Sequence, residues 1–273
     1  MSAKRPIGIF DSGVGGLSAV RAIRESGNHY PIIYFGDTAR VPYGTRDEET
    51  IISYAKQDLM YLLNKNVDYI LVACGTVSAV ALTILQKMTN IPIVGIVEPT
   101  AEMAASKTCN GKIAVLATEA TVRSHAFSNA IHDRNQDISV IEIACPLFVP
   151  LVENAYIDKE NPVSRLVAQE YLEKVKAHKA DTVILGCTHF PLLKEIISDL
   201  IPETTIIDSS YEAVKMLPDS LKSYKQNAAN EENDIYTSGS IEQFQKVGKI
   251  FIGDSFSLSI HHVEQSDYTN ILL

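Results

Sequence analysis

Two stretches of the sequence end an apolar run on a cysteine: ILVACGTVSA at residues 70–79 and VILGCTHFPLL at residues 183–193. In each, the cysteine (Cys74 or Cys187) precedes a segment of helical character. Continuous apolar runs of this length are typical of strands covered on both faces, as in parallel sheets. The two stretches therefore predict an α/β fold containing two equivalent strand–cysteine–helix units.

Similar strand-sized runs alternate with longer helical patterns along most of the chain. Segments 47–65 and 163–179 carry apolar residues at helical spacing. Alternation of this kind predicts parallel sheets with right-handed crossover connections. The expected strands cover residues 6–10, 31–36, 68–73, 91–96, 112–117, 138–143, 181–186 and 204–208.

The chain also repeats itself loosely. Residues 7–13 resemble residues 113–119, and residues 68–76 resemble residues 181–189. The second pair shares an acidic residue six positions before the cysteine and a hydroxyl residue soon after it. Two copies of one α/β unit are the simplest source of such a pattern.

We therefore expect two similar parallel-sheet α/β domains that face each other across a central cleft, related by a pseudo-two-fold duplication. Residues 1–97 plus 209–273 would form the first domain and residues 98–208 the second. Ligands of open parallel sheets bind outside the carboxyl ends of the strands. Cys74 and Cys187 would then face one cleft from opposite sides.

The charge and composition limit the kinds of partner that the protein is expected to bind. The 273 residues include 24 Lys plus Arg against 33 Asp plus Glu, a net charge of −9. This charge disfavours nucleic acid or an anionic membrane as a partner. No apolar run approaches a membrane span, and the first residues lack the apolar core of a signal peptide. We expect a cytoplasmic protein whose four cysteines are reduced thiols.

Two facing thiols suit proton transfer at a carbon centre. The start of a helix lowers the pKa of a thiol, and a thiol near its usual pKa of ~8.5 can serve as base or acid. One thiolate could remove a proton from carbon while a thiol on the opposite face returns another. Such an exchange inverts the centre without a cofactor.

Polar residues near the two cysteines complete the expected site. Asp11 could bind a substrate ammonium group or assist Cys74, and His189 could play the corresponding part near Cys187. The loop RVPYGTR at residues 40–46 is placed to close over the mouth of the cleft.

Anion-binding features lie beside these residues. Thr76 and Thr188 could hold a carboxylate near the starts of helices. The glycine-rich turn FDSGVGGLS at residues 10–18 favours an anion but matches no nucleotide-binding spacing.

Taken together, seven motifs resemble the glutamate racemases of the cofactor-independent aspartate/glutamate racemase superfamily. The matches occur in order from about residue 7 to 252, with YTSGSIEQFQKVGKIFIG as a last match beyond the seven motifs, and cover most of the chain. The motifs are GIFDSGVGGLSAVRAI, YFGDTARVPYGTR, LVACGTVSA, IPIVGIVEP, VLATEATVRSHAF, ACPLFVPLVE and LGCTHFPLL.

The resemblance implies two α/β domains that enclose glutamate, with a cysteine on each face of the α-carbon and no cofactor or metal. It also implies production of D-glutamate for peptidoglycan, usually by a homodimer. Carried over by motif, the catalytic residues are Cys74, Cys187, Asp11, His189 and Glu153. The implied substrate-binding residues are Asp11, Ser12, Tyr43, Gly44, Gly75, Thr76, Thr118, Thr188 and His189.

Two positions depart from the family pattern. The family usually has asparagine where this chain has Gly75, and loss of the amide hydrogen bond would cost roughly 0.5–1.5 kcal/mol. A water molecule could take the vacated space, so we expect impaired activity or an altered substrate preference. The second departure is Tyr211, where the family more often has a small residue, and it is expected to alter packing at the edge of the cleft.

Other interpretations of the same residues stay open. The chain could racemise aspartate or another acidic amino acid, or bind such a ligand with little chemistry. A cysteine hydrolase with Cys187 as nucleophile and His189 as base would leave Cys74 idle. A zinc site that includes the two thiols is a further interpretation, but the sequence has no C-x-x-C or H-E-x-x-H spacing to support it. Thiolates bound to zinc could also not move protons. Cys109 and Cys145 are expected to be structural.

Overall fold

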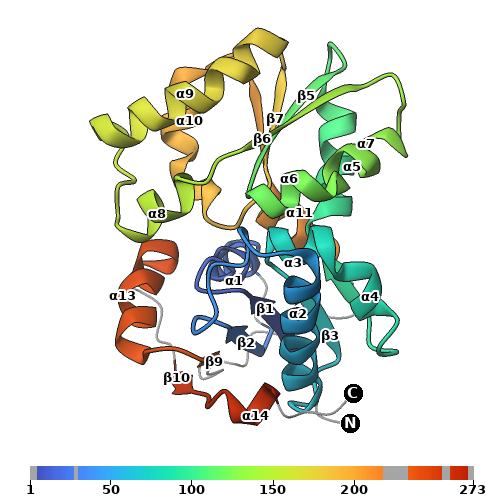
Figure 1. Cartoon of the computed structure of the whole chain (residues 1–273), viewed down its shortest axis with the longest axis vertical. Coiled ribbons are helices and arrows are strands. Elements are labelled where there is room, and N and C mark those ends of the chain that lie inside the picture. The colour runs from blue at the N-terminus through green and yellow to red at the C-terminus, as the bar shows by residue number, and fades with distance from the viewer. Residues whose placement is uncertain (1–4, 28–29, 218–232, 254–258, 270–273) are drawn as a thin grey trace.

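The computed structural model describes residues 5–27, 30–217, 233–253 and 259–269, and its strands form two sheets. The strands of the first sheet are β1 (Ile7–Asp11), β2 (Ile32–Gly36), β3 (Tyr69–Val72), β4 (Ile93–Gly95), β9 (Asp234–Thr237) and β10 (Ser259–His262). Those of the second sheet are β5 (Lys112–Ala117), β6 (Ser139–Ala144), β7 (Thr182–Leu185) and β8 (Thr205–Asp208). The two sheets occupy the lower and upper parts of Figure 1.

Helices connect and cover the strands. Those between β1 and β5 are α1 (Leu17–Glu25), α2 (Glu48–Leu63), α3 (Gly75–Val80), α4 (Leu82–Gln86) and α5 (Val97–Lys107). Those between β5 and β9 are α6 (Glu119–Ser124), α7 (Ala126–His132), α8 (Phe148–Glu153), α9 (Pro162–His178), η1 (Phe190–Leu193), α10 (Lys194–Leu200) and α11 (Ser209–Lys215). The last are α13 (Ile241–Ile252) and α14 (Ser266–Thr269).

The two long helices begin at capping side chains that the sequence supplies. Asp47 accepts a hydrogen bond from the backbone N–H of Thr50 at 2.8 Å and starts α2. Asn161 caps α9 in the same way, with proline at the first helical position. The predicted helical segments 47–65 and 163–179 are thus α2 and α9.

The strand order repeats between the sheets. The first sheet runs β10-β9-β2-β1-β3-β4 and the second β6-β5-β7-β8, and every pairing is parallel. The order β2-β1-β3-β4 is therefore matched by β6-β5-β7-β8, and the two cysteine-bearing strands, β3 and β7, hold equivalent places. This arrangement confirms the predicted α/β class with two similar parallel sheets.

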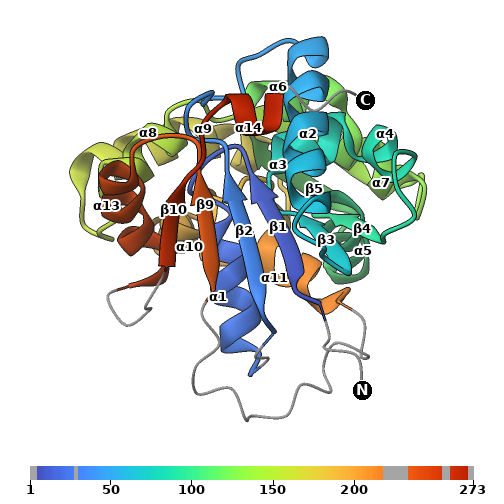
Figure 2. The same ribbon diagram turned by 90° about the horizontal axis from the view of Figure 1, so that it is seen from below.

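All eight predicted strands are present, and the structure adds two. β9 and β10 lie side by side at one edge of the first sheet (Figure 2). β9 alternates between buried and half-buried residues, and β10 has no buried residue. Neither carries the continuous apolar run on which the prediction rested.

The predicted domain boundaries remain a prediction, supported by the distribution of strands. Strands β1–β4, β9 and β10 lie within residues 1–97 and 209–273, whereas β5–β8 lie within residues 98–208. None of the helices in the described part of the chain is long and apolar enough to cross a membrane.

Candidate active site

Cys74 and Cys187 line the same cavity, which has a volume of about 350 Å³. Cys74 follows β3 and starts α3, whereas Cys187 lies just beyond β7. Each sheet thus delivers one thiol to the cavity from the carboxyl end of an equivalent strand. Every site residue predicted from the sequence lines this cavity except Asp11.

The Cys74 thiol is buried and holds its proton strongly. Its sulfur lies 3.6 Å from Ser12 Oγ, to which the S–H donates. Burial, and then the nearby Asp11 carboxylate, raise the pKa of Cys74 to about 12. The backbone N–H of Val77 and the Ser12 contact lower the pKa, but they do not outweigh burial. The expectation that the helix start would lower this pKa is wrong for Cys74, because desolvation is the larger effect.

Cys187 lies beside a charged histidine. His189 Nδ1 is 4.0 Å from Cys187 Sγ, and His189 Nε2 is 3.0 Å from Glu153 Oε1. Burial acts to lower the pKa of His189, but its contacts with Cys187 and Glu153 prevail and raise the pKa to about 10. At neutral pH the imidazole is therefore cationic, between a sulfur and a carboxylate.

Asp11 lies behind the cavity wall. The backbone N–H of Gly13 donates to Asp11 Oδ1 at 2.9 Å, and Thr188 Oγ1 donates to Oδ2 at 3.4 Å. Burial raises the pKa of Asp11, and the charge of His189 partly opposes this effect. Asp11 thus connects the turn after β1 to the loop that carries Cys187.

Hydroxyl groups of the two halves of the molecule, each half being one sheet with its helices, meet across the cavity. Thr76, in the first turn of α3, lies with its Oγ1 3.0 Å from that of Thr118. Thr118 caps α6 and is 2.9 Å from Thr121 Oγ1. Thr188 Oγ1 lies 3.4 Å from His189 Nδ1. These hydroxyls give the cavity donors and acceptors at both sheets.

The loop after β2 forms one wall of the cavity. The backbone carbonyl of Gly44 accepts from the N–H of Ala120 at 2.9 Å and so joins the loop to the second half. The Tyr43 hydroxyl donates to Asp37 and, at 3.0 Å, to Asp58. These two bonds tie the loop to the buried side chains of Asp37 and Asp58.

Gly75 allows the two thiol-bearing loops to touch. A Cβ atom at this position would lie 2.2 Å from the carbonyl oxygen of Gly186, the residue before Cys187. Gly15 is similar, since its Cβ would lie 2.3 Å from Thr188 Oγ1. These glycines serve close packing between the halves, a reason that the sequence alone did not indicate.

Sequence reasoning missed some residues of the cavity wall. Cys145 is buried and lines the cavity, although we expected only a structural thiol there. It follows β6, so the rule that sites form at the carboxyl ends of parallel strands could have found it. Cys109 is the exposed thiol, in the turn after α5. The other missed wall residues are Glu119, Pro146, Val149 and Pro150, whereas Gly13, Val41, Pro42 and Thr45 belong to the turn 10–18 and the loop 40–46 that the sequence analysis placed at the site.

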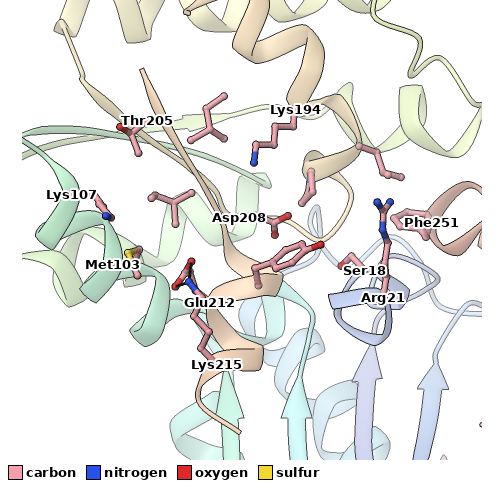
Figure 3. Close-up of a pocket in the computed structure, with 15 residues that line it drawn as sticks. Ser18, Arg21, Met103, Lys107, Lys194, Thr205, Asp208, Glu212, Lys215 and Phe251 are labelled. Atoms are coloured by element: carbon pink, nitrogen blue, oxygen red, sulfur yellow. Dashed lines mark hydrogen bonds and ion pairs between the residues drawn. The ribbon is translucent and has the colours of Figure 1, made fainter. Parts of the chain in front are cut away.

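A second cavity of about 670 Å³ lies elsewhere between the halves (Figure 3). It is lined by charges of both signs, including Arg21, Lys194 and Asp208, and by no cysteine. Tyr211 lines this cavity rather than the one with the thiols. The larger cavity therefore contains none of the predicted site residues.

Among the residues that the structure describes, no group of three or more His, Cys, Asp or Glu is arranged to hold a metal ion.

Comparisons with known proteins agree with this fold and identify a family. The family model for Asp/Glu/Hydantoin racemase matches residues 18–217. The glutamate racemase of Chlorobaculum tepidum is 47% identical over 212 residues, 77% of each chain. That of Sulfurihydrogenibium sp. is 40% identical and covers 97% of this chain and 100% of its own. The crystal structure of Francisella tularensis glutamate racemase in complex with D-glutamate gives a TM-score of 0.88 at 34% identity, over 97% of this chain and 99% of that one.

These matches confirm the resemblance to glutamate racemases and the expected fold. The range that the family model matches includes Cys74, Cys187 and the three cavity threonines, Thr76, Thr118 and Thr188. The chain therefore belongs to the Asp/Glu/hydantoin racemase family.

Proposed function

We propose that the protein interconverts L- and D-glutamate by proton transfer between the α-carbon and two thiols. The observation that carries the proposal is the shared cavity, to which Cys74 and Cys187 come from equivalent strands of two different sheets. A volume of about 350 Å³ is at the small end of ligand pockets and suits an amino acid. The relatives named above are glutamate racemases, and one of them was crystallised with D-glutamate.

The chemistry needs one sulfur with a proton and one without. Cys74 holds its proton at neutral pH, so from this state Cys187 acts first, as the base. The Cα–H bond breaks as the Cys187 thiolate takes the proton, and the Cys74 S–H gives its proton to the opposite face of the carbanion. The carbon is inverted, Cys187 is left as a thiol and Cys74 as a thiolate. The reverse reaction exchanges these roles, and no cofactor takes part.

The remaining residues would bind the substrate and stabilise charge. The Thr76, Thr118 and Thr188 hydroxyls can hold the carboxylates of glutamate. His189, cationic beside Cys187, offers a positive charge where negative charge moves between sulfur and carbon. Glu153 fixes the ring from the other side, and Asp11 orients the Cys187 loop through Thr188.

Deuterium exchange and single substitutions test the proposal. With wild-type protein in deuterated water, the α-proton signals of both enantiomers should disappear as they interconvert. Cys74→Ser and Cys187→Ser should each lower the racemisation rate by about 10²- to 10⁴-fold, the usual contribution of a positioned acid or base. Cys109→Ser, at the exposed thiol, is the control and should behave as wild type. Normal racemisation by either active-site variant would rule out the two-thiol mechanism.

Gly75 supports a second candidate, racemisation of aspartate or another acidic amino acid. The side chain that the family usually carries at this position is absent, which removes a contact to the polar end of the substrate. Parallel assays of glutamate and aspartate decide between the two substrates. Binding measured by calorimetry without α-proton exchange would instead indicate a ligand-binding relative.

We further infer a cellular role and an assembly. D-Glutamate is consumed in peptidoglycan synthesis, so the protein would act in cell wall biogenesis and cell shape, as a cytoplasmic homodimer without nucleic-acid or membrane partners. The family membership and the net charge of −9 support this inference. Depletion should make cells dependent on added D-glutamate, and light scattering should give twice the mass of one chain. A monomeric mass at working concentration would remove the dimer from the proposal.

A further inference from the structure

The segment formed by helix α14 (Ser266–Thr269) contacts a buried polar cluster behind the thiol cavity. α14, beside α2 and the carboxyl end of the first sheet in Figure 2, carries the fully buried Tyr268. Its hydroxyl donates to Asp37 Oδ1 at 3.0 Å. Its ring packs edge-on against Phe35, with 5.2 Å between the ring centres. The segment is therefore fixed to the residues that follow β2.

Asp37 is the centre of this cluster and is completely buried. Besides Tyr268, Ser238 Oγ donates to its Oδ1 at 2.8 Å, and Arg40 Nε and the Tyr43 hydroxyl donate to its Oδ2. A buried carboxylate needs such donors because it has lost its water. Each donor that holds Asp37 in place therefore also helps to fix Arg40 and Tyr43, which both donate to its Oδ2.

Tyr268 also contacts Arg40 directly, in addition to the link through Asp37. Its guanidinium lies 4.8 Å from the centre of the Tyr268 ring, within the range of a cation–π contact. The same guanidinium donates to Asp58 Oδ1 at 2.8 Å. Burial, and then the neighbouring Asp37, raise the pKa of Asp58 well above its ordinary value. The position of Arg40, at the start of the cavity loop, therefore depends on Tyr268 directly and through Asp37.

From this cluster the chain leads straight into the cavity. The residues after Arg40, 41–45, line the cavity, and Tyr43 among them is bonded to Asp37. The Gly44 carbonyl then joins the loop to the N–H of Ala120 in the second half. One end of the loop is anchored in the cluster and the other in the opposite half.

We propose that Tyr268 is a positioning residue for the reaction. By anchoring Asp37 and Arg40, it holds residues 41–45 in the shape that lines the cavity, although Tyr268 does not itself line it. This inference rests on the proposed function in one respect, that the cavity binds glutamate. Because the loop would contact the substrate and moves no proton, Tyr268 acts on substrate binding rather than on the chemical step.

Tyr268→Phe tests the inference, since it removes the hydroxyl and keeps the buried ring. Loss of one hydrogen bond to a buried carboxylate should raise the KM of both enantiomers by about two- to tenfold, with kcat little changed. Backbone amides of residues 37–46 should exchange faster with deuterium, while those of β9 and β10 keep their protection. The control is Thr269→Val, which removes a hydrogen bond internal to the segment, from Thr269 Oγ1 to the Gln265 carbonyl.

A double-mutant cycle shows whether Tyr268 acts through the loop. Tyr43→Phe removes the loop's own bond to Asp37, so Tyr268→Phe should raise KM less in that background than in wild type. Unchanged KM and unchanged exchange in Tyr268→Phe, or equal changes in Thr269→Val, would overturn the inference. Additive effects of the two substitutions would overturn the route through Asp37. Failure of wild-type protein to racemise glutamate counts against the proposed function alone, because the exchange measurement needs no turnover.

Discussion

A side chain at residue 75 would collide with the backbone of the other half of the molecule. The Cβ of Gly75→Ala would lie 2.2 Å from the Gly186 carbonyl oxygen, so the loops would have to separate by about 1 Å to restore an ordinary contact. Cys187 follows Gly186 directly and would move with it. Because misplacement of this size costs up to about 100-fold in rate, we expect a 10- to 100-fold lower kcat/KM for racemisation.

Gly248→Ala is the matched control for this substitution. Gly248 lies inside α13, where a Cβ would lie 3.2 Å from the movable Cδ1 of Leu17. The substitution Gly248→Ala should leave kcat/KM unchanged. Gly75→Asn, which introduces the residue usual in the family, should lower activity as Gly75→Ala does. Restored or enhanced turnover in either Gly75 variant would show that the contact with Gly186 does not set the thiol positions.

At the scale of elements, α8 helps Cys187 to maintain the charge of His189. This helix ends at Glu153, whose carboxylate contacts His189 Nε2 at 3.0 Å. The pKa of His189 is raised from 6.5 to about 10, so the folded chain keeps a proton that the unfolded chain releases. The stabilisation is fully present below about pH 6.5, and the free energy of unfolding falls as the pH rises towards 10.

Glu153→Gln should make this fall smaller. The neutral amide supports the imidazolium less, so the pKa of His189 moves back towards its ordinary value. Urea unfolding between pH 6.5 and 7.5 measures the slope below the range in which Cys74 contributes, because that range begins near the unfolded thiol's ordinary pKa of about 8.5. Glu170→Gln, at an exposed position of α9, should keep the wild-type slope. An identical slope in Glu153→Gln would mean that α8 does not maintain the charge of His189.

How far the elements follow from the sequence depends on what each one buries. The eight predicted strands are mostly apolar, and β3 and β7 are buried at every residue, so composition alone reveals them. β9 and β10 are held by pairing with a neighbouring strand, which a linear pattern does not record. The thiols were predictable because a motif repeats. The contact of Gly75 with Gly186 and the cluster around Asp37 join residues far apart in the chain, and only the folded arrangement reveals them.

For the whole molecule, the cavity is one of the places where the two halves contact each other. Thr76 contacts Thr118, Gly44 accepts from Ala120, and the Arg46 carbonyl accepts from Arg123 at 2.8 Å. A ligand bound here touches both halves at once. We therefore expect binding to stabilise the two halves together.

Scanning calorimetry with D-glutamate checks this expectation. At about 100 times the dissociation constant, the ligand should add about 2.7 kcal/mol to the free energy of unfolding. The whole heat-absorption profile should move to higher temperature, whether it contains one transition or two. Sodium chloride at the same ionic strength is the control. Two transitions of which only one moves with D-glutamate would show that the ligand contacts one half alone.

The exposure of Cys109 has a practical consequence for covalent labelling. Three of the four cysteines are buried and Cys109 is not, so an alkylating reagent such as iodoacetamide meets Cys109 first. Inactivation by alkylation would implicate the cavity thiols only if it lagged behind the first equivalent of reagent incorporated. The same asymmetry makes Cys109 a natural attachment point for a fluorophore or a surface tether, outside the wall of the thiol cavity.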